Sequence, residues 1–219
     1  TDVTFTGNIA SHEGGGIYSF ESPVTISGGM FIDNSAGTAG GGMRTMAGTT
    51  SLIAVNFLGN SAAAAGGMYT EEGEATLTNV VFSGNTAGDG GGILNGRSFL
   101  TLTNTTFSQN IATNPFSFGG GLINTEFSES TIQNCIFWRN IADQDAQIIN
   151  QGVTTINDSL VQDGCPGWGI GGGIYFFTNV MDATPQFGDT DGPDNNVGTM
   201  DDDNRLLFGS PAINSGKNP

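Results

Sequence analysis

Residues 82–93 of this 219-residue chain read Phe-Ser-Gly-Asn-Thr-Ala-Gly-Asp-Gly-Gly-Gly-Ile, and the same unit recurs along the sequence. Its first half, Phe-x-x-Asn with Ala two residues after the Asn, begins at Phe5, Phe31, Phe57, Phe82, Phe107 and Phe137. Its second half, a Gly-rich run before an aliphatic residue, ends at Ile17, Met43, Met68, Ile93, Leu122 and Ile174. A unit of roughly 25 residues that repeats in this way indicates coils that share a core with their neighbours.

A third apolar position lies five residues before each Phe, at Ile26, Leu52, Leu77, Leu102 and Ile132, with Ile156 five before Val161. Three short β-type segments per unit, separated by Gly and Asn turns and lacking a helical period, predict an all-β fold. We expect a right-handed parallel β-helix (solenoid) of about seven coils, in which equivalent residues stack ~4.8 Å apart. The boundaries are 1–181 for the coils and 182–219 for an irregular, Asp-rich C-terminal cap packed on the same domain.

The asparagines of the repeat form one predicted structural ladder. Such residues tolerate a left-handed conformation and can pass side-chain amide hydrogen bonds from coil to coil. The expected ladder is Asn8, Asn34, Asn60, Asn85, Asn110 and Asn140. The 36 glycines are expected at corners where a Cβ would clash.

Charge and hydropathy exclude several partners. Five Lys and Arg against 21 Asp and Glu give a formal charge of -16, which argues against nucleic acid and against an anionic membrane surface. No apolar run approaches the ~20 residues of a membrane helix, so we expect no membrane insertion of this segment. Residues 1–10 lack a basic start and a long apolar core, so we expect any secretion signal to be absent or already removed. The first residues lie in mid-coil, which predicts a longer parent protein or end-to-end contact with another subunit.

The residue after each inward aliphatic should point outward, because side chains alternate along a strand. This column reads Tyr18, Arg44, Tyr69, Leu94, Ile123, Ile149 and Tyr175. An outward stripe this apolar favours a partner face for a neighbouring subunit, a larger protein or a sugar stacked on the tyrosines. The alternative interpretation is a strand face covered by the chain's own C-terminal tail.

The tail contains six aspartates within fifteen residues: Asp189, Asp191, Asp194, Asp201, Asp202 and Asp203. Alternating oxygens on a Gly-containing turn suit Ca²⁺, which takes six to eight oxygen ligands. The run lacks the spacing and final Glu of an EF-hand. It is therefore either a calcium site or a solvated acidic loop.

Catalytic readings have weaker support. A polysaccharide lyase needs a base, but the cations Arg44, Arg97, Arg139, Arg205 and Lys217 are scattered. A glycosidase needs two carboxylates, for which the sequence offers clusters at Glu71, Glu72 and Glu74 and at Glu126 and Glu129. The single histidine, His12, has no evident Ser or Cys partner, so we expect no catalytic triad.

The column beside Ile26 to Ile156 is rich in Thr and Ser, an arrangement that ice-binding β-solenoids also present. It includes the pairs Thr76 and Thr78, and Thr101 and Thr103, but is broken at Ile53, Gln133 and Asn157. Threonine is also a common exposed strand residue.

The sequence leaves open whether its two cysteines form a disulfide. Cys135 lies two residues before Phe137 and should point inward as a small apolar filler. A bridge to Cys165 would require the loop 164–167 to fold back.

The paired Phe-x-x-Asn and Gly-Gly-x-aliphatic signature resembles the repeat of the polymorphic outer-membrane proteins and related bacterial surface β-helix proteins, which act as adhesins. The resemblance covers about residues 1–175. The tail resembles the end of secreted β-helix proteins that carry choice-of-anchor domains. These resemblances imply a secreted or cell-surface, non-enzymatic β-helix that serves adhesion or fibre and coat assembly, with calcium stiffening its cap. Its partner would be a protein or glycan at a surface, and end-to-end or lateral self-association is expected. A glycan-active lyase or hydrolase is the second hypothesis, and ice binding the third.

Overall fold

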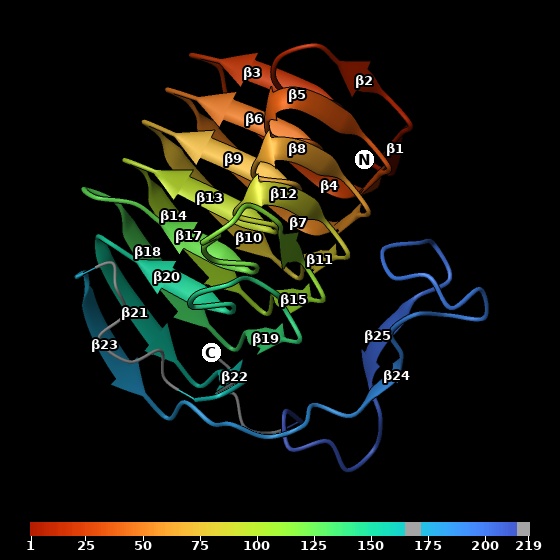
Figure 1. Cartoon of the computed structure of the whole chain (residues 1–219), viewed down its shortest axis with the longest axis vertical. Helices are drawn as coiled ribbons and strands as arrows, with labels where there is room; N and C mark the ends of the chain where they lie inside the picture. The colour runs from red at the N-terminus through yellow and green to blue at the C-terminus, as the bar shows by residue number, and fades with distance from the viewer. Residues whose placement is uncertain (165–171, 214–219) are drawn as a thin grey trace.

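The computed structural model describes residues 1–164 and 172–213. Within them the chain is built from strands and turns, and no helix is long and apolar enough to cross a membrane. Parallel strands stack in about seven turns roughly 25 residues apart, which confirms the predicted parallel β-helix (Figure 1).

Three parallel sheets run along the solenoid. The large sheet contains β1 (Val3–Thr6), β4 (Val24–Ile32), β7 (Thr49–Leu58), β10 (Glu74–Thr78), β11 (Val81–Ser83), β14 (Phe99–Thr103), β15 (Thr106–Ser108), β18 (Glu129–Gln133), β19 (Ile136–Trp138), β21 (Val153–Asn157), β22 (Leu160–Val161) and β23 (Ile174–Thr178). The six-stranded sheet contains β3 (Ile17–Phe20), β6 (Met43–Met46), β9 (Met68–Glu71), β13 (Ile93–Gly96), β17 (Leu122–Asn124) and β20 (Ile148–Asn150). The five-stranded sheet contains β2 (Ile9–Ala10), β5 (Ser35–Ala39), β8 (Ser61–Ala64), β12 (Thr86–Asp89) and β16 (Ile111–Ala112). In the tail, β24 (Phe187–Asp189) and β25 (Asp203–Leu206) pair antiparallel.

The phenylalanines of the repeat form one continuous stack through the core. Neighbouring ring centroids from Phe5 to Phe137 lie 4.5–5.0 Å apart with nearly parallel planes. The last glycine of each of the first five Gly-rich runs permits this stack: a Cβ on Gly67 would lie 2.7 Å from the Phe82 ring. The aliphatic columns are buried beside the rings. Cys135 joins this core as a free thiol, and burial raises its pKa to about 12, while Cys165 lies outside the described residues.

The ladder asparagines pass hydrogen bonds along the whole stack. Asn60 Nδ2 donates to Asn85 Oδ1 (2.9 Å) and to Phe31 O (2.8 Å), and Asn60 N donates to the same Asn85 Oδ1 (3.0 Å). At the C-terminal side Asn140 Nδ2 donates to Gln147 Oε1 (2.8 Å). The left-handed conformation, expected at these asparagines, lies instead one residue earlier, at Gly7, Asp33, Gly59, Gly84, Gln109 and Arg139. The earlier residue makes the corner, which leaves the Asn side chain directed inward.

The last coil departs from the predicted register. Ile174 and Tyr175 were expected in the six-stranded sheet, but β23 pairs with β21 in the large sheet, where Tyr175 lies opposite Thr154. The cause is coil length: Phe177 follows its partner Ile156 by only 21 residues, so the chain has already returned to the large sheet. Tyr175 stacks on Phe177 with ring centroids 5.3 Å apart.

The tail lies against the side of the solenoid, along the turns that carry the Asn ladder (Figure 1). Gly198 packs closely enough on this side that a Cβ would lie 2.8 Å from Gly59 N. Gln109 Nε2 donates to Thr190 O (3.3 Å). The tail therefore contacts the side of several coils.

Asn85→Ala tests the ladder. The substitution removes the acceptor of two Asn60 donors and the donor to Phe57 O, and buried groups left unpaired cost about 1–3 kcal/mol each. We expect the free energy of unfolding, measured in guanidinium, to fall by about 3 kcal/mol or more. The control is Asn104→Gly, because Asn104 is exposed and left-handed, and its side chain donates to the side chain of Asn79 (3.1 Å). Equal losses in the two variants would contradict a dominant role for the buried ladder.

Candidate functional site

The predicted outward stripe is only partly a surface. Six of its members, Tyr18 through Ile149, are in register on the six-stranded sheet, whereas Tyr175 is not on that sheet. Arg44, Ile123 and Ile149 are buried. Ile123 and Ile149 pack on Gly119, at the end of the longest coil's extra segment, where a Cβ would lie 2.6 Å from Ile123 Cγ1. The C-terminal part of the stripe, at Ile123 and Ile149, is therefore covered by the chain itself.

The upper half of the stripe carries a charge network. The Arg44 guanidinium, 3% exposed, lies 3.8 Å from the centre of the Tyr69 ring and pairs with Glu71 (2.5 Å) and Glu13 (3.6 Å). The other carboxylate oxygen of Glu71 accepts a hydrogen bond from Arg97 Nη2 (2.9 Å). Alternating charges thus connect successive coils, and a buried cation is paired as its desolvation requires.

Tyr69 is held over a glycine. A Cβ on Gly96 would lie 3.1–3.2 Å from the Tyr69 ring and hydroxyl, so this neighbour must be small. Burial and the nearby Glu71 carboxylate raise the pKa of the Tyr69 phenol. Tyr69 therefore remains a neutral hydrogen-bonding group at ordinary pH.

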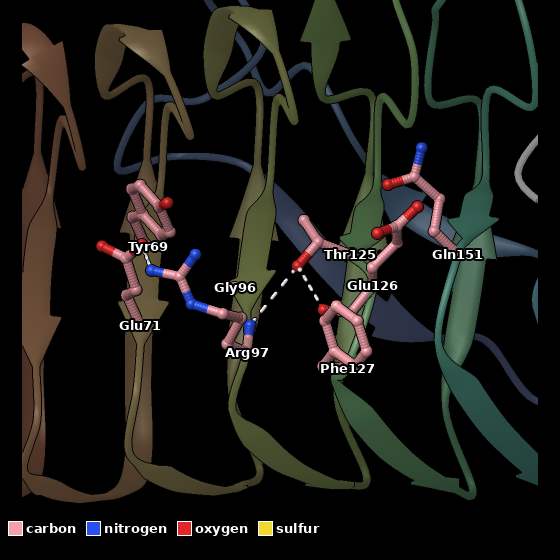
Figure 2. A pocket seen from close by; sticks show the side chains of 8 residues that line it. All are labelled: Tyr69, Glu71, Gly96, Arg97, Thr125, Glu126, Phe127 and Gln151. Atoms are coloured by element: carbon pink, nitrogen blue, oxygen red, sulfur yellow. Dashed lines mark hydrogen bonds and ion pairs between the residues drawn. The ribbon is translucent and has the colours of Figure 1, made fainter.

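A depression of about 360 Å³ opens beside this network. Figure 2 shows the residues that line it: Tyr69, Glu71, Gly96, Arg97, Thr125, Glu126, Phe127 and Gln151. A second depression of about 580 Å³ adjoins it and shares Glu126, Phe127 and Gln151. Of the predicted stripe, only Tyr69 reaches the site.

Unequal turns create the two hollows. The turns join the six-stranded sheet to the large sheet, in which Phe99, Glu129 and Val153 are aligned. The turn between Asn95 and Phe99 has three residues, the turn between Asn124 and Glu129 has four, and the turn between Asn150 and Val153 has two. The turn of residues 125–128 therefore projects beyond the turns on both sides, and Phe127 forms the wall between the depressions.

The projecting turn is tied down on several sides. Ser128 N donates to Thr125 O (3.2 Å), Ser128 Oγ donates to Asn95 O (3.1 Å), and Arg97 N donates to Thr125 Oγ1 (3.3 Å). Beneath it a second amide ladder is buried, in which Asn95 Nδ2 donates to Asn124 Oδ1 (2.7 Å) and Asn124 Nδ2 to Asn150 Oδ1 (2.8 Å). These contacts hold Phe127 at φ +61° with its side chain exposed.

The structure separates the predicted glutamates. Glu71 and Glu126 line one depression, Glu126 and Glu129 line the other, and Glu72 pairs with Arg97 outside both. Glu74 and Glu129 are two coils apart with Phe99 between them. Phe127 and Gln151 were not predicted as site residues. The signals that could have found them are the changing turn length and an aromatic at a glycine-favouring position.

His12 is exposed and does have a serine neighbour, contrary to the expectation. Its Nδ1 lies 2.9 Å from Ser11 Oγ. The two residues are adjacent in the sequence and lie away from both depressions.

The six tail aspartates are engaged in different contacts. Asp202 accepts from Gly198 N (2.7 Å) and Ser83 Oγ (3.2 Å), and its burial raises its pKa. The Arg205 guanidinium donates two hydrogen bonds to Asp203 and the Arg205 backbone N–H a third, which lower the pKa of Asp203 to about 2. Thr199 donates to Asp201 and lowers the pKa of that carboxyl group. Among the described residues no group of three or more His, Cys, Asp or Glu is placed to hold a metal. Asp189 ends strand β24 opposite Asp203, whereas Asp191 and Asp194 lie in the turn that follows. Calcium stays a prediction.

The Thr-rich face is regular in the middle of the large sheet. Thr76, Thr101, Thr131 and Thr155 are aligned on successive strands. The neighbouring column runs from Thr78 and Thr103 to Gln133 and Asn157, so the predicted break is present.

Asp202→Ala tests how the tail is held. Removing this carboxylate deletes the contact between the tail and Ser83, together with the acceptor of the Gly198 amide. We expect the Gly198 amide to exchange with deuterium at least tenfold faster while amides of the Phe stack are unchanged. The matched control is Asp203→Ala, because Asp203 pairs with Arg205 inside the tail. Unchanged exchange at Gly198 in the Asp202 variant would contradict this attachment.

Two segments match the model of the Chlamydia polymorphic membrane protein repeat, at residues 2–19 and 79–96. The segments are equivalent parts of coils three apart, and each contains a Phe-x-x-Asn turn and the following Gly-rich run. No curated protein and no solved structure matches the chain. Together with the fold, the matches show a polymorphic-membrane-protein-like β-helix repeat protein.

Proposed function

We propose that this chain is a non-enzymatic, extracellular or cell-surface β-helix that serves adhesion or structural assembly. The repeat is that of a membrane-protein family, which supports a location at the surface. The observation that carries a binding role is Phe127, which is 86% exposed on a rigid turn between two depressions. An aromatic side chain that lines two concave depressions together with polar groups favours a binding site.

A glycan-active enzyme is the second candidate, because Glu71 and Glu126 line the same depression. Glycoside hydrolysis requires one carboxyl group to deliver a proton and the other to act as base or nucleophile. Both oxygens of Glu71 are already engaged by Arg44 and Arg97. This arrangement supports binding over bond cleavage. Ice binding ranks third, because the aligned threonines form one unbroken column and a second, interrupted one.

Adhesion is tested with beads coated with the folded chain. We expect them to attach to cultured animal or bacterial cells several-fold more than beads coated with the heat-unfolded chain, which carries the same -16 charge. Attachment counted by microscopy should persist at high salt, since the site is not built on net charge. Equal attachment of folded and unfolded coats would overturn the adhesion proposal.

We further propose that calcium stiffens the tail and favours self-association. Asp194 N donates to Asp201 Oδ2 (3.3 Å), and a Cβ on Gly192 would lie 2.9 Å from Asp201 Cγ, so the Asp201 carboxylate lies over this turn. Carboxylate and carbonyl oxygens on such a turn suit Ca²⁺.

Sedimentation velocity with 1 mM calcium and with EDTA tests this. We expect larger species with calcium that become smaller with EDTA. The double variant Asp194→Asn, Asp201→Asn should lose the effect, and Asp33→Asn, an exposed aspartate outside the tail, should retain it. A monomer indifferent to EDTA would contradict both the calcium role and the self-association.

A further inference from the structure

We infer that the two depressions beside Phe127 bind a neutral oligosaccharide, with Phe127 as the stacking platform. This rests on the proposed binding function and names its ligand class. The inference begins with the backbone, because Phe127 occupies a conformation that disfavours its own side chain.

Phe127 has φ +61°, a left-handed conformation that is unfavourable for a residue with a Cβ. Equivalent corners in other coils carry Glu21, Ala47, Glu72 and Arg97 in the same conformation, so the corner itself is structural. What is particular to this coil is a large apolar ring there, together with one added residue that pushes it outward. Neither the ring nor its exposure stabilises the fold.

Polar groups surround the ring on both sides. The shared lining residues Glu126 and Gln151 supply a carboxylate acceptor and an amide that both donates and accepts. Tyr69 and Thr125 add hydroxyl groups in the first depression (Figure 2). The Phe127 ring offers an apolar face for stacking, and the groups around it can form hydrogen bonds with hydroxyl groups. This combination suits a sugar, which has C–H faces and a rim of hydroxyl groups.

The charges favour a neutral ligand. The only cation in the lining of the first depression, Arg97, is paired with Glu71 and with Glu72. Glu126 adds a negative charge, and the chain as a whole carries -16. Uronic, sialic or sulfated sugars would therefore be repelled.

Two adjoining depressions on either side of one aromatic suit a ligand with repeating units. They share three residues, so one sugar on each side of Phe127 would use the same polar groups. Hydroxyl groups need acceptors and donors rather than a full charge, so the site should tolerate neutralisation of Glu126 to an amide.

The test is isothermal titration against neutral linear oligosaccharides of the gluco, galacto, manno and N-acetylglucosamine types, with oligogalacturonate and hexalysine as charged probes. We expect at least one neutral oligosaccharide to bind and both charged probes to bind at least tenfold more weakly. Phe127→Ala should lower the affinity at least tenfold, and Glu126→Gln less than threefold.

The matched control is Phe116→Ala. Phe116 is also left-handed (φ +64°), 72% exposed and on a turn closed by Ser117 N donating to Asn114 O (2.9 Å), but it lines neither depression. Its removal should leave affinity unchanged, and both Phe variants should keep the wild-type unfolding midpoint.

Absence of binding to every neutral oligosaccharide would overturn the inference, as would equal loss in the Phe127 and Phe116 variants. Preferred binding of hexalysine, lost in Glu126→Gln, would also overturn it and assign the site to a basic peptide. The bead-attachment assay distinguishes the glycan inference from the adhesion proposal. Attachment without sugar binding would contradict the glycan inference and leave adhesion supported. Sugar binding without attachment would contradict adhesion alone.

Discussion

The buried Asn ladder is the constraint on which the rest of this molecule depends. Each buried amide donates to the side-chain oxygen of the next coil's Asn and to a backbone carbonyl of the preceding coil, and its own oxygen accepts from the side-chain amide and backbone N–H of the preceding coil's Asn. A pattern of this kind can be satisfied only if every coil returns to the same place one strand spacing further along. The Phe stack requires the same translation, since its ring centroids repeat at 4.5–5.0 Å. Polar and apolar columns thus impose one register, and consistency between them defines a single fold.

That register leaves the turns as the main place where coils can differ. Between Phe107 and Phe137 the chain is 30 residues long instead of 25 or 26, and the additional residues lie in two turns that flank β17. One turn packs Gly119 on the stripe and covers Ile123 and Ile149, and the other lifts Phe127 into solvent. The same insertion therefore closes part of the surface expected to bind a partner and opens another part. A rigid scaffold with variable turns is where binding residues concentrate.

The fold could be predicted because its determinants repeat. Six copies of Phe-x-x-Asn make the columns evident, and from Phe31 to Phe137 and from Met43 to Ile148 the Phe and aliphatic columns are buried as expected, whereas Ile174 is 56% exposed. Tyr175 could not be placed from the same pattern, because its Gly–Ile run looks like the others, whereas Ile174 follows its partner Val153 on the large sheet by only 21 residues. The left-handed corner was misplaced by one residue because Asn tolerates that conformation, but here its amide is needed inside. The candidate site was found only in part, since Tyr69 and the glutamates follow the repeat, whereas Phe127 and Gln151 depend on differences between successive turns.

The charge network beside the two depressions holds two of the chain's few cations in place. Arg44 and Arg97 are two of only five cations, and both are placed against Glu71 rather than distributed over the surface. Stacking Arg44 on Tyr69 fixes the phenol, and the Arg97 turn, held by Thr125, fixes the base of the turn that carries Phe127. Buried pairs such as Arg44 and Glu71 add little net stability but are costly to break, so they serve orientation. The cations thus hold the aromatic groups in position, so the binding proposed for this site would depend on ring faces and hydrogen-bonding groups rather than on long-range charge.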